Sequence, residues 1–104
     1  MRYTVTRHPL VRSDMLDITR LIGDYAGYPI AGQKIAEFRS AMKSLRDYPH
    51  IGTVRHDIHP GLRALPAGEK GVICFTVDDR TETVHIVCVT YAGADWQARA
   101  RGRS

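Results

Sequence analysis

The sequence predicts an α+β fold in the order β-α-α-β-β-β, with an antiparallel sheet packed against an α-helical hairpin. Two observations lead to this prediction. Residues 57–96 contain three short apolar runs separated by turn residues, which is the pattern of an antiparallel meander. Residues 11–45 repeat apolar side chains at steps of three and four, which is typical of amphipathic helices. Because the apolar face of each helix must be buried, we expect both helices to cover one face of the sheet.

The chain begins with a strand and a helix. Residues 2–7 alternate in the manner of a short strand, and Pro9 ends this strand and suits the first turn of a helix. Ser13 with Asp14 provides an alternative N-cap one turn later, and Gly27 ends the helix. The expected apolar face of this helix consists of Val11, Met15, Ile18, Ile22 and Tyr25.

A second helix follows after a tight connection. Pro29 can open this helix, and Pro49 together with Gly52 bounds its end. Two consecutive amphipathic helices with so short a link form an antiparallel hairpin. The expected apolar stripe of the second helix consists of Ile35, Phe38, Met42 and Leu45.

The meander supplies the centre of the sheet. Its apolar runs are Leu62–Leu65, Val72–Val77 and Val84–Tyr91, and a polar turn at residues 78–82 joins the last two. Cys74 and Cys88 lie inside these last two runs. The two cysteines could pair, but their apolar neighbours favour buried, reduced thiols.

The length and composition predict a single domain. With 104 residues, of which 43% are hydrophobic and 25% charged, the chain can bury one core but not two. No apolar run approaches the roughly 18 residues of a membrane span, and the N-terminus lacks the apolar region of a secretory signal. We therefore expect a cytoplasmic protein with no membrane partner, in which residues 1–96 form the domain and residues 97–104 form a basic C-terminal tail or the end of a short last helix.

The positive charge of the chain is unevenly distributed. Arg99, Arg101 and Arg103 fall at the C-terminus, and removing these three charges from the net charge of +4 leaves +1. Bulk charge therefore says little about partners. A further set of cations follows one side of the second helix, where it would either contact phosphates or an acidic partner, or form a solvated face. These cations are Arg39, Lys43 and Arg46.

Few residues offer catalytic chemistry. His56 and His59 share a loop but lack a third ligand, so we expect no metal site, and no cofactor-binding motif is present. Trp96 could be a core residue or an anchor in an interface. Metal-free RNA cleavage needs a base, an acid and cations around the phosphate. The residues in or beside the meander that could supply these groups are Arg63, Lys70, Arg80, His85 and Tyr91.

The ordered series of short motifs in residues 49–96 resembles the RelE/ParE superfamily, the toxins of type II toxin–antitoxin modules. The two preceding helices agree in order and length with the helical hairpin of that superfamily. No single motif is decisive, but the ordered series is specific. It consists of Pro49, Gly52, Arg55-x-Asp57, Pro60-Gly61-Leu62-Arg63, Pro66-x-Gly68, Phe75-x-Val77-Asp78-Asp79, Val84-x-Ile86-x-x-Val89 and Tyr91-x-Gly93-x-Asp95-Trp96.

This resemblance implies a toxin that is neutralised by a cognate antitoxin within a hetero-oligomer. A segment of the antitoxin would order on binding and wrap across the helical hairpin and the sheet. Leu21, Tyr25 and Tyr28 are the candidate contacts for the antitoxin.

The resemblance also implies a choice between two activities. ParE-like members inhibit DNA gyrase and so DNA replication, whereas RelE-like members are ribosome-dependent mRNA endonucleases. The sequence is closer to ParE, which favours binding of gyrase, with Arg63, Tyr91, Asp95 and Trp96 as candidate contacts. The alternative is RelE-like cleavage by Arg63, Arg80, His85 and Tyr91. Tyr91 and Ala94 replace the histidine and arginine of the usual ParE-like ending, which leaves a non-toxic partner-binding module as a third possibility.

Overall fold

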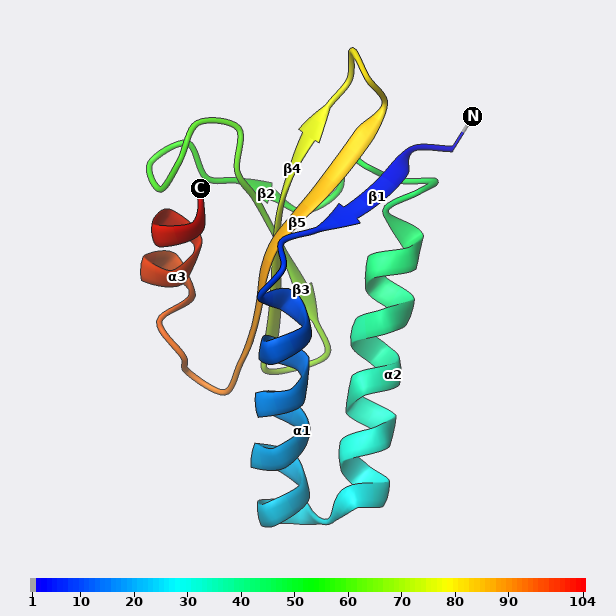
Figure 1. Ribbon diagram of the computed structural model, residues 1–104, viewed down its shortest axis with the longest axis vertical. Coiled ribbons are helices and arrows are strands. Elements are labelled where there is room, and N and C mark those ends of the chain that lie inside the picture. The colour runs from blue at the N-terminus through cyan, green and yellow to red at the C-terminus, as the bar shows by residue number, and fades with distance from the viewer. Residues whose placement is uncertain (1) are drawn as a thin grey trace.

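Residues 2–104, which the computed structural model describes, form five strands and three helices (Figure 1). The helices α1 and α2 are antiparallel and cover one face of the sheet, and α3 packs on the other face. The predicted α+β architecture is confirmed, and β2 and α3 are added to it. In chain order the elements are β1 (Thr4–Arg7), α1 (Val11–Ala26), α2 (Tyr28–Ser44), β2 (Thr53–Val54), β3 (Arg63–Ala67), β4 (Gly71–Asp78), β5 (Thr83–Tyr91) and α3 (Trp96–Arg103).

The sheet has the strand order β1-β5-β4-β3-β2. The predicted meander is confirmed, because β3, β4 and β5 pair antiparallel with short turns between them. The expectation of a wholly antiparallel sheet is wrong in one respect, because β1 pairs parallel with β5. After the helical hairpin, the chain enters the sheet again at β2, on the edge opposite β1. The following strands then cross the sheet one by one until β5 lies beside β1 and runs in the same direction. The sheet is therefore mixed.

The first long helix, α1, differs from the sequence prediction near both of its ends. Asp14 is not an N-cap: α1 already begins at Val11, and Asp14 lies buried inside it. Tyr25 is not part of the buried face, since 89% of it is exposed. The hairpin connection is tight, because a Cβ added at Gly23 would lie 2.4 Å from the Tyr28 ring. No helix within residues 2–104 has the length and apolar character needed to cross a bilayer.

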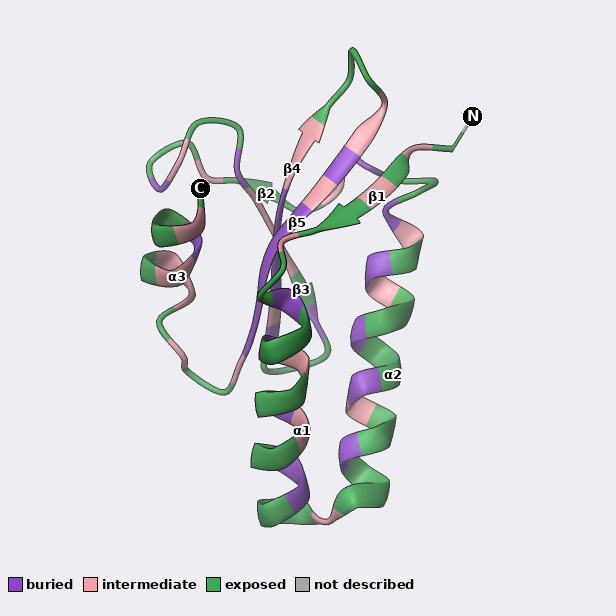
Figure 2. Cartoon of the chain, in the orientation of Figure 1, coloured by how far each residue is buried: buried purple, intermediate pink, exposed green. Residues whose placement is uncertain are grey.

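The sheet separates two clusters of buried side chains, and a β-bulge in β5 changes which of its residues face each cluster. Figure 2 shows buried residues along β5 and on α1 and α2. Cys74 pairs with Cys88 and Phe75 with Ile86, so that Val87 is an extra residue in β5. Val84 and Ile86 before this point and Val89 after it face the helices, whereas Val87 and Cys88 both face α3. The apolar stripe predicted for the second helix is confirmed, and all of its residues lie in the helix-side cluster. The helix-side cluster is Val11, Ile18, Ile22, Ala31, Ile35, Phe38, Met42, Leu45, Ala67, Ile73, Phe75, Val84, Ile86 and Val89, and the second is Ile58, Leu62, Cys74, Val87, Cys88 and Ala100.

A buried carboxylate joins α1, β5 and α3. Asp14 is only 3% exposed and accepts a hydrogen bond from the backbone N–H of Val89 at 3.1 Å. The guanidinium of Arg103 donates to both carboxylate oxygens at 2.6 and 2.7 Å, and that of Arg99 lies 3.4 Å away. The stretch expected as a basic tail or a short last helix is thus a helix, and two of its arginines hold it against the sheet.

We predict that Asp14→Ala lowers the free energy of unfolding by about 3–5 kcal/mol, because the substitution leaves the largely buried Arg103 without its anion. Urea denaturation followed by circular dichroism measures the change. Asp17→Ala is the matched control, since Asp17 lies on the exposed side of the same helix and should change stability by less than about 0.5 kcal/mol. Equal effects of the two substitutions would contradict a structural role for Asp14.

Candidate functional site

His85 and Tyr91, two of the residues considered for RNA cleavage, do not converge. His85 lies on the sheet face opposite the helices, where its Nδ1 is 2.8 Å from the Oγ1 of Thr6. Tyr91 lies farther along β5 and packs on the helix side. At about 3.3 Å per residue, roughly 20 Å of strand separates the two residues. A general acid and base must both come within hydrogen-bond distance of the reacting group, so these residues do not form one reaction centre.

Arg63 and Arg80 lie in two further places. The pairing of Arg63 with Phe75 places it on the helix side of the sheet, and its Nη1 donates to the backbone oxygen of His50 at 3.0 Å. Arg80 lies in the exposed turn between β4 and β5, where its backbone N–H donates to Oδ1 of Asp78 at 3.0 Å. The structure therefore distributes the predicted catalytic set over both faces and one end of the sheet.

A polar cluster that the sequence did not reveal lies beside Arg63. Oδ1 of Asp79 accepts a hydrogen bond from the Tyr3 hydroxyl at 2.7 Å and lies 2.7 Å from Nε2 of His50. The hydrogen bond from Tyr3, together with that from His50, lowers the pKa of Asp79 below the usual carboxyl value. Each residue comes from a different part of the chain, so no local spacing could have indicated the cluster.

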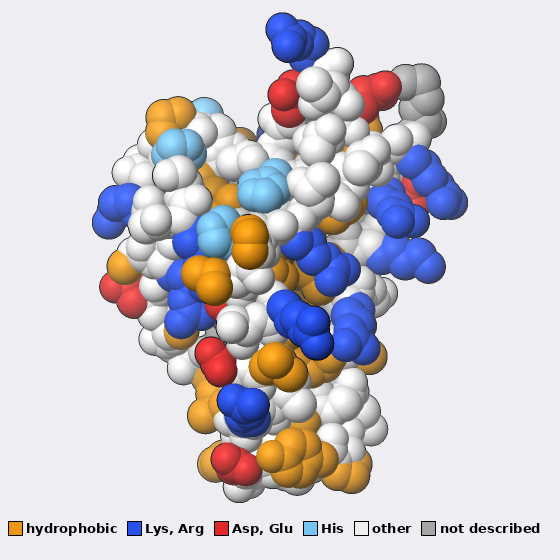
Figure 3. Space-filling model, in the orientation of Figure 1, with side chains coloured by type: hydrophobic (Ala, Val, Ile, Leu, Met, Phe, Trp, Pro, Cys, Tyr) orange, Lys and Arg blue, Asp and Glu red, His pale blue; other side chains and the backbone are white. Residues whose placement is uncertain are grey.

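An apolar groove lies between the tip of the helical hairpin and the end of β5. It has a volume of about 260 Å³, and Tyr91 lines it together with two of the candidate antitoxin contacts, Leu21 and Tyr25. The third, Tyr28, is 57% exposed, and its ring packs close to Gly23 of α1 instead of lining this groove. Figure 3 shows hydrophobic side chains gathered over this end of the molecule. The full lining is Leu21, Ile22, Tyr25, Ala26, Ile30, Lys70, Tyr91 and Ala92.

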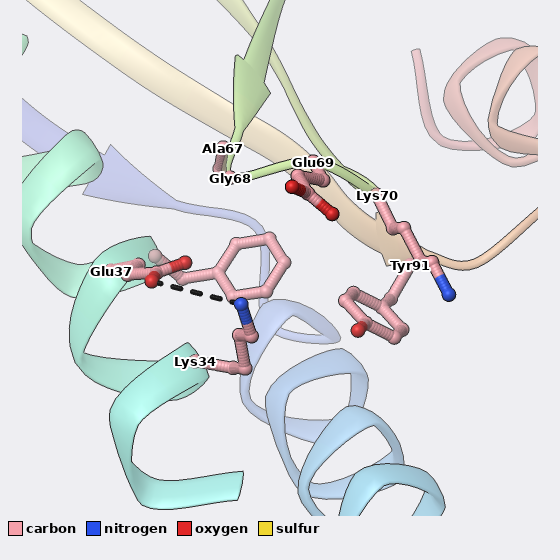
Figure 4. A pocket seen from close by; sticks show the side chains of 8 residues that line it. Lys34, Glu37, Ala67, Gly68, Glu69, Lys70 and Tyr91 are labelled. Carbon is pink, nitrogen blue, oxygen red and sulfur yellow. Dashed lines mark ion pairs between the residues drawn. The ribbon is translucent and has the colours of Figure 1, made fainter. Parts of the chain in front are cut away.

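A charged pocket continues this groove toward α2 (Figure 4). It has a volume of about 190 Å³ and shares Lys70 and Tyr91 with the apolar groove. Lys34 and Glu37 form an ion pair of 3.9 Å at its α2 wall, and the ring of Tyr91 packs edge-on against Phe38. We call the two cavities together the hairpin groove. Its centre is apolar and aromatic, and lysines flank it from α2 and from the β3–β4 turn.

Asp95 and Trp96 hold α3 and the adjacent loop in place. Asp95 is the N-cap of α3 and accepts a hydrogen bond from the backbone N–H of Ala98 at 3.1 Å. Trp96 is half-buried and lies under the guanidinium of Arg55, 5.2 Å from the ring centre. Arg55 in turn binds Asp57 through two hydrogen bonds of 2.9 Å, which lower the pKa of that carboxyl. Asp95 and Trp96, both candidate contacts for the target, therefore also stabilise the fold, and part of Trp96 remains exposed.

The basic side of α2 faces β1. Arg39, Lys43 and Arg46 line a groove of about 300 Å³ together with Arg7. Within residues 2–104 none of these four side chains forms an ion pair. Figure 3 shows Lys and Arg side chains gathered over this side of the molecule. Two C-terminal arginines bind Asp14, whereas the four cations of this groove have no ion-pair partner among the described residues, so the groove is a strongly basic surface.

The loop with the two histidines has a structural hydrogen bond. Nδ1 of His56 accepts from the backbone N–H of Gly61 at 3.0 Å, which fixes one ring nitrogen in the loop. Among the residues that the structure describes, no three His, Cys, Asp or Glu side chains are grouped as a metal site would require.

Comparison with known proteins identifies the family. A family model described as the ParE toxin of the type II toxin–antitoxin system parDE matches residues 5–96. A search of curated proteins finds no significant match to the chain.

Solved structures have the same fold at low sequence identity. A structure of the chromosomal ParDE system from P. aeruginosa has a TM-score of 0.74 at 16% identity, covering 88% of this chain and 97% of that one. A mutant of the E. coli toxin RelE in the free state has a TM-score of 0.69 at 11% identity, covering 98% and 96%. The toxin–antitoxin complex RelBE2 from Mycobacterium tuberculosis has a TM-score of 0.62 at 18% identity, covering 88% and 100%.

The fold likeness agrees with the family match, which spans most of the chain from β1 to the start of α3. The protein therefore belongs to the ParE toxin family of type II toxin–antitoxin systems.

Proposed function

We propose that this toxin acts by binding DNA gyrase and is held inactive by an antitoxin that occupies the hairpin groove. The observation that supports binding over catalysis is the separation of His85 from Tyr91 on opposite faces of the sheet. The matching family is that of ParE toxins, and the resemblance to ParE-like toxins implies gyrase as the target. The candidate contacts for gyrase remain Arg63, Tyr91, Asp95 and the exposed part of Trp96.

The hairpin groove has the chemistry of a peptide-binding site. Its aromatic and aliphatic side chains suit the apolar face of an amphipathic helix, and Tyr25 is the most exposed of them. Tyrosines at the centre of such grooves often supply most of the binding free energy. Lys34 and Lys70 flank the apolar centre and would pair with acidic side chains of the antitoxin. The ParDE and RelBE2 relatives are toxin–antitoxin systems, and a hetero-oligomer with an antitoxin is the corresponding proposal here.

Ribosome-dependent cleavage of mRNA is the second candidate function. It is favoured by the cluster of Tyr3, His50 and Asp79 beside Arg63, which unites an imidazole, a phenol and a cation. The Asp79 carboxylate holds the imidazole of His50 as an orienting group holds a general base. The four residues predicted from the sequence for this activity, Arg63, Arg80, His85 and Tyr91, lie too far apart to form one reaction centre in this structure.

We predict that the purified toxin inhibits supercoiling of relaxed plasmid by gyrase and traps cleaved DNA. Agarose gels that resolve topoisomers and linear DNA measure both effects. Addition of the antitoxin in equimolar amount should restore supercoiling, because the complex holds the toxin inactive. Unchanged supercoiling and no cleaved DNA at a tenfold excess of toxin would reject gyrase as the target.

We predict that Tyr25→Ala weakens binding of the antitoxin by about 2 kcal/mol, or roughly 30-fold in Kd, because an exposed aromatic anchor is lost. Titration calorimetry with the purified antitoxin measures this change. Tyr48→Ala is the matched control, since Tyr48 is also exposed but lies beyond the end of α2, away from the groove. Similar Kd values for both variants and the unmodified toxin would place the antitoxin elsewhere.

We predict that expression without the antitoxin arrests growth and leaves translated mRNA uncut, because the toxin acts by binding gyrase. Sequencing of mRNA 5′ ends after induction tests this prediction. Cuts at defined codons that disappear in His50→Ala would establish the nuclease function through the Asp79 cluster, whereas cuts lost in Tyr91→Phe would assign it to the set named from the sequence. Normal growth at full expression would instead indicate a non-toxic partner-binding module.

A further inference from the structure

Cys74 and Cys88 face each other across β4 and β5. The two residues are direct partners in the antiparallel register, immediately beside the bulge. Both side chains belong to the small cluster under α3, and both thiols are free and fully buried. Neither cysteine lines the hairpin groove or the cluster around Asp79, so neither antitoxin binding nor the proposed target contacts use them.

The register places the two thiols within reach of a disulfide bond. Residues directly opposite in an antiparallel pair have Cα atoms about 4.5–5.5 Å apart, and disulfides span Cα separations of about 4.4–6.8 Å. The two side chains also point to the same face of the sheet. Bond formation therefore requires rotation of the side chains and little movement of the backbone.

The layer that covers the thiols is thin. It consists of α3, which contributes Ala100, and of the loop that contributes Ile58 and Leu62. The ion pair of Arg103 with Asp14 holds α3 against β5. Among the residues that the structure describes, none of α3 belongs to the helix-side cluster, so α3 can lift from β5 without disturbing that core, and its lifting exposes the pair.

The surroundings distinguish the two thiols. The hydrogen bond between the cysteines lowers the pKa of Cys88, and the guanidinium of Arg103 acts in the same direction against the effect of burial. The same hydrogen bond, together with burial, raises the pKa of Cys74. The hydrogen bond from Cys74 does not depend on α3 and persists when Arg103 moves away. Because the thiolate is the nucleophile in exchange with disulfides, Cys88 is the group that reacts first.

We propose that Cys74 and Cys88 form a redox site, which a small-molecule disulfide such as oxidised glutathione converts into a cross-strand disulfide when α3 lifts from the sheet. The Cys88 thiolate attacks one sulfur of the small molecule, forming a mixed disulfide and releasing one thiolate. The sulfur of Cys74 then loses its proton and attacks the sulfur of Cys88, which releases the second thiolate. The two cysteine protons pass to the released thiolates, so the protein loses two electrons and two protons and the small molecule gains them.

The protein is incubated with oxidised glutathione under native conditions, quenched with acid, and then treated with an excess of a maleimide in denaturant near neutral pH, where thiols react with it. Intact mass spectrometry should show the loss of two hydrogens with neither glutathione nor maleimide attached, and a peptide map should contain Cys74 joined to Cys88. The oxidised protein should retain its circular dichroism spectrum and melt about 10 °C higher than the reduced protein, because the bond restricts the unfolded chain. A thermal shift that a reductant reverses is the second readout.

Cys74→Ser and Cys88→Ser are the controls for the bond, and neither should show a melting temperature that depends on reductant. Arg103→Ala should speed oxidation at least tenfold by releasing α3, whereas Arg101→Ala, at an exposed position of the same helix, should leave the rate unchanged. The proposal is overturned if both thiols of the unmodified protein still react with maleimide after oxidation, if the reaction stops at the mixed disulfide, or if the oxidised protein melts lower. Equal rates in the two arginine variants would overturn the role of α3.

Discussion

The extra residue that Val87 introduces into β5 determines how the two faces of the sheet are used. A strand with regular alternation would send every second side chain of β5 toward the helices, so His85 and Tyr91 would lie on one face. The bulge reverses this relation halfway along the strand. Val84 and Ile86 face the helices before the bulge, and Val89 faces them after it. The helix-side core therefore continues along the whole strand, while Tyr91 is brought into the hairpin groove.

The same displacement creates the second cluster. Because Val87 and Cys88 both face away from the helices, they leave an apolar patch that α3 covers. A short basic helix has little apolar surface of its own, with Ala100 as its one buried residue among those described. The buried Asp14 compensates for this deficit, because it binds Arg103 from the other side of β5 next to Val89. Docking of α3 therefore depends strongly on this carboxylate, because removing one partner of a buried ion pair costs far more free energy than the pair contributes.

Local patterns in the sequence predicted most of the fold. The spacing of Ile35, Phe38 and Met42 predicted the buried stripe of α2, and the Pro and Gly residues between apolar runs predicted the meander. The bulge was not predictable, because residues 86–89 are an unbroken apolar run with no turn residue or polar side chain to mark the irregularity at Val87. The parallel pairing of β1 and the burial of Asp14 depend on segments distant in the sequence, and local periodicity carries no information about such contacts. The candidate site was less predictable than the fold for the same reason: Leu21, Tyr25 and Tyr91 meet in one groove, but only Leu21 and Tyr25 share a helix.

Three features of this small domain lie in separate places. The hairpin groove lies at the tip of α1 and α2, the basic groove lies between β1 and α2, and α3 lies on the opposite face of the sheet. A segment bound at the hairpin tip, as proposed, would not cover α3, so the proposed dithiol site would be as accessible in the complex as in the free toxin. The basic groove is likewise separate from the hairpin tip, since the two share no residue. Under the proposed function, the antitoxin need not cover every surface, provided that its segment blocks the approach of the target to Tyr91 in the hairpin groove.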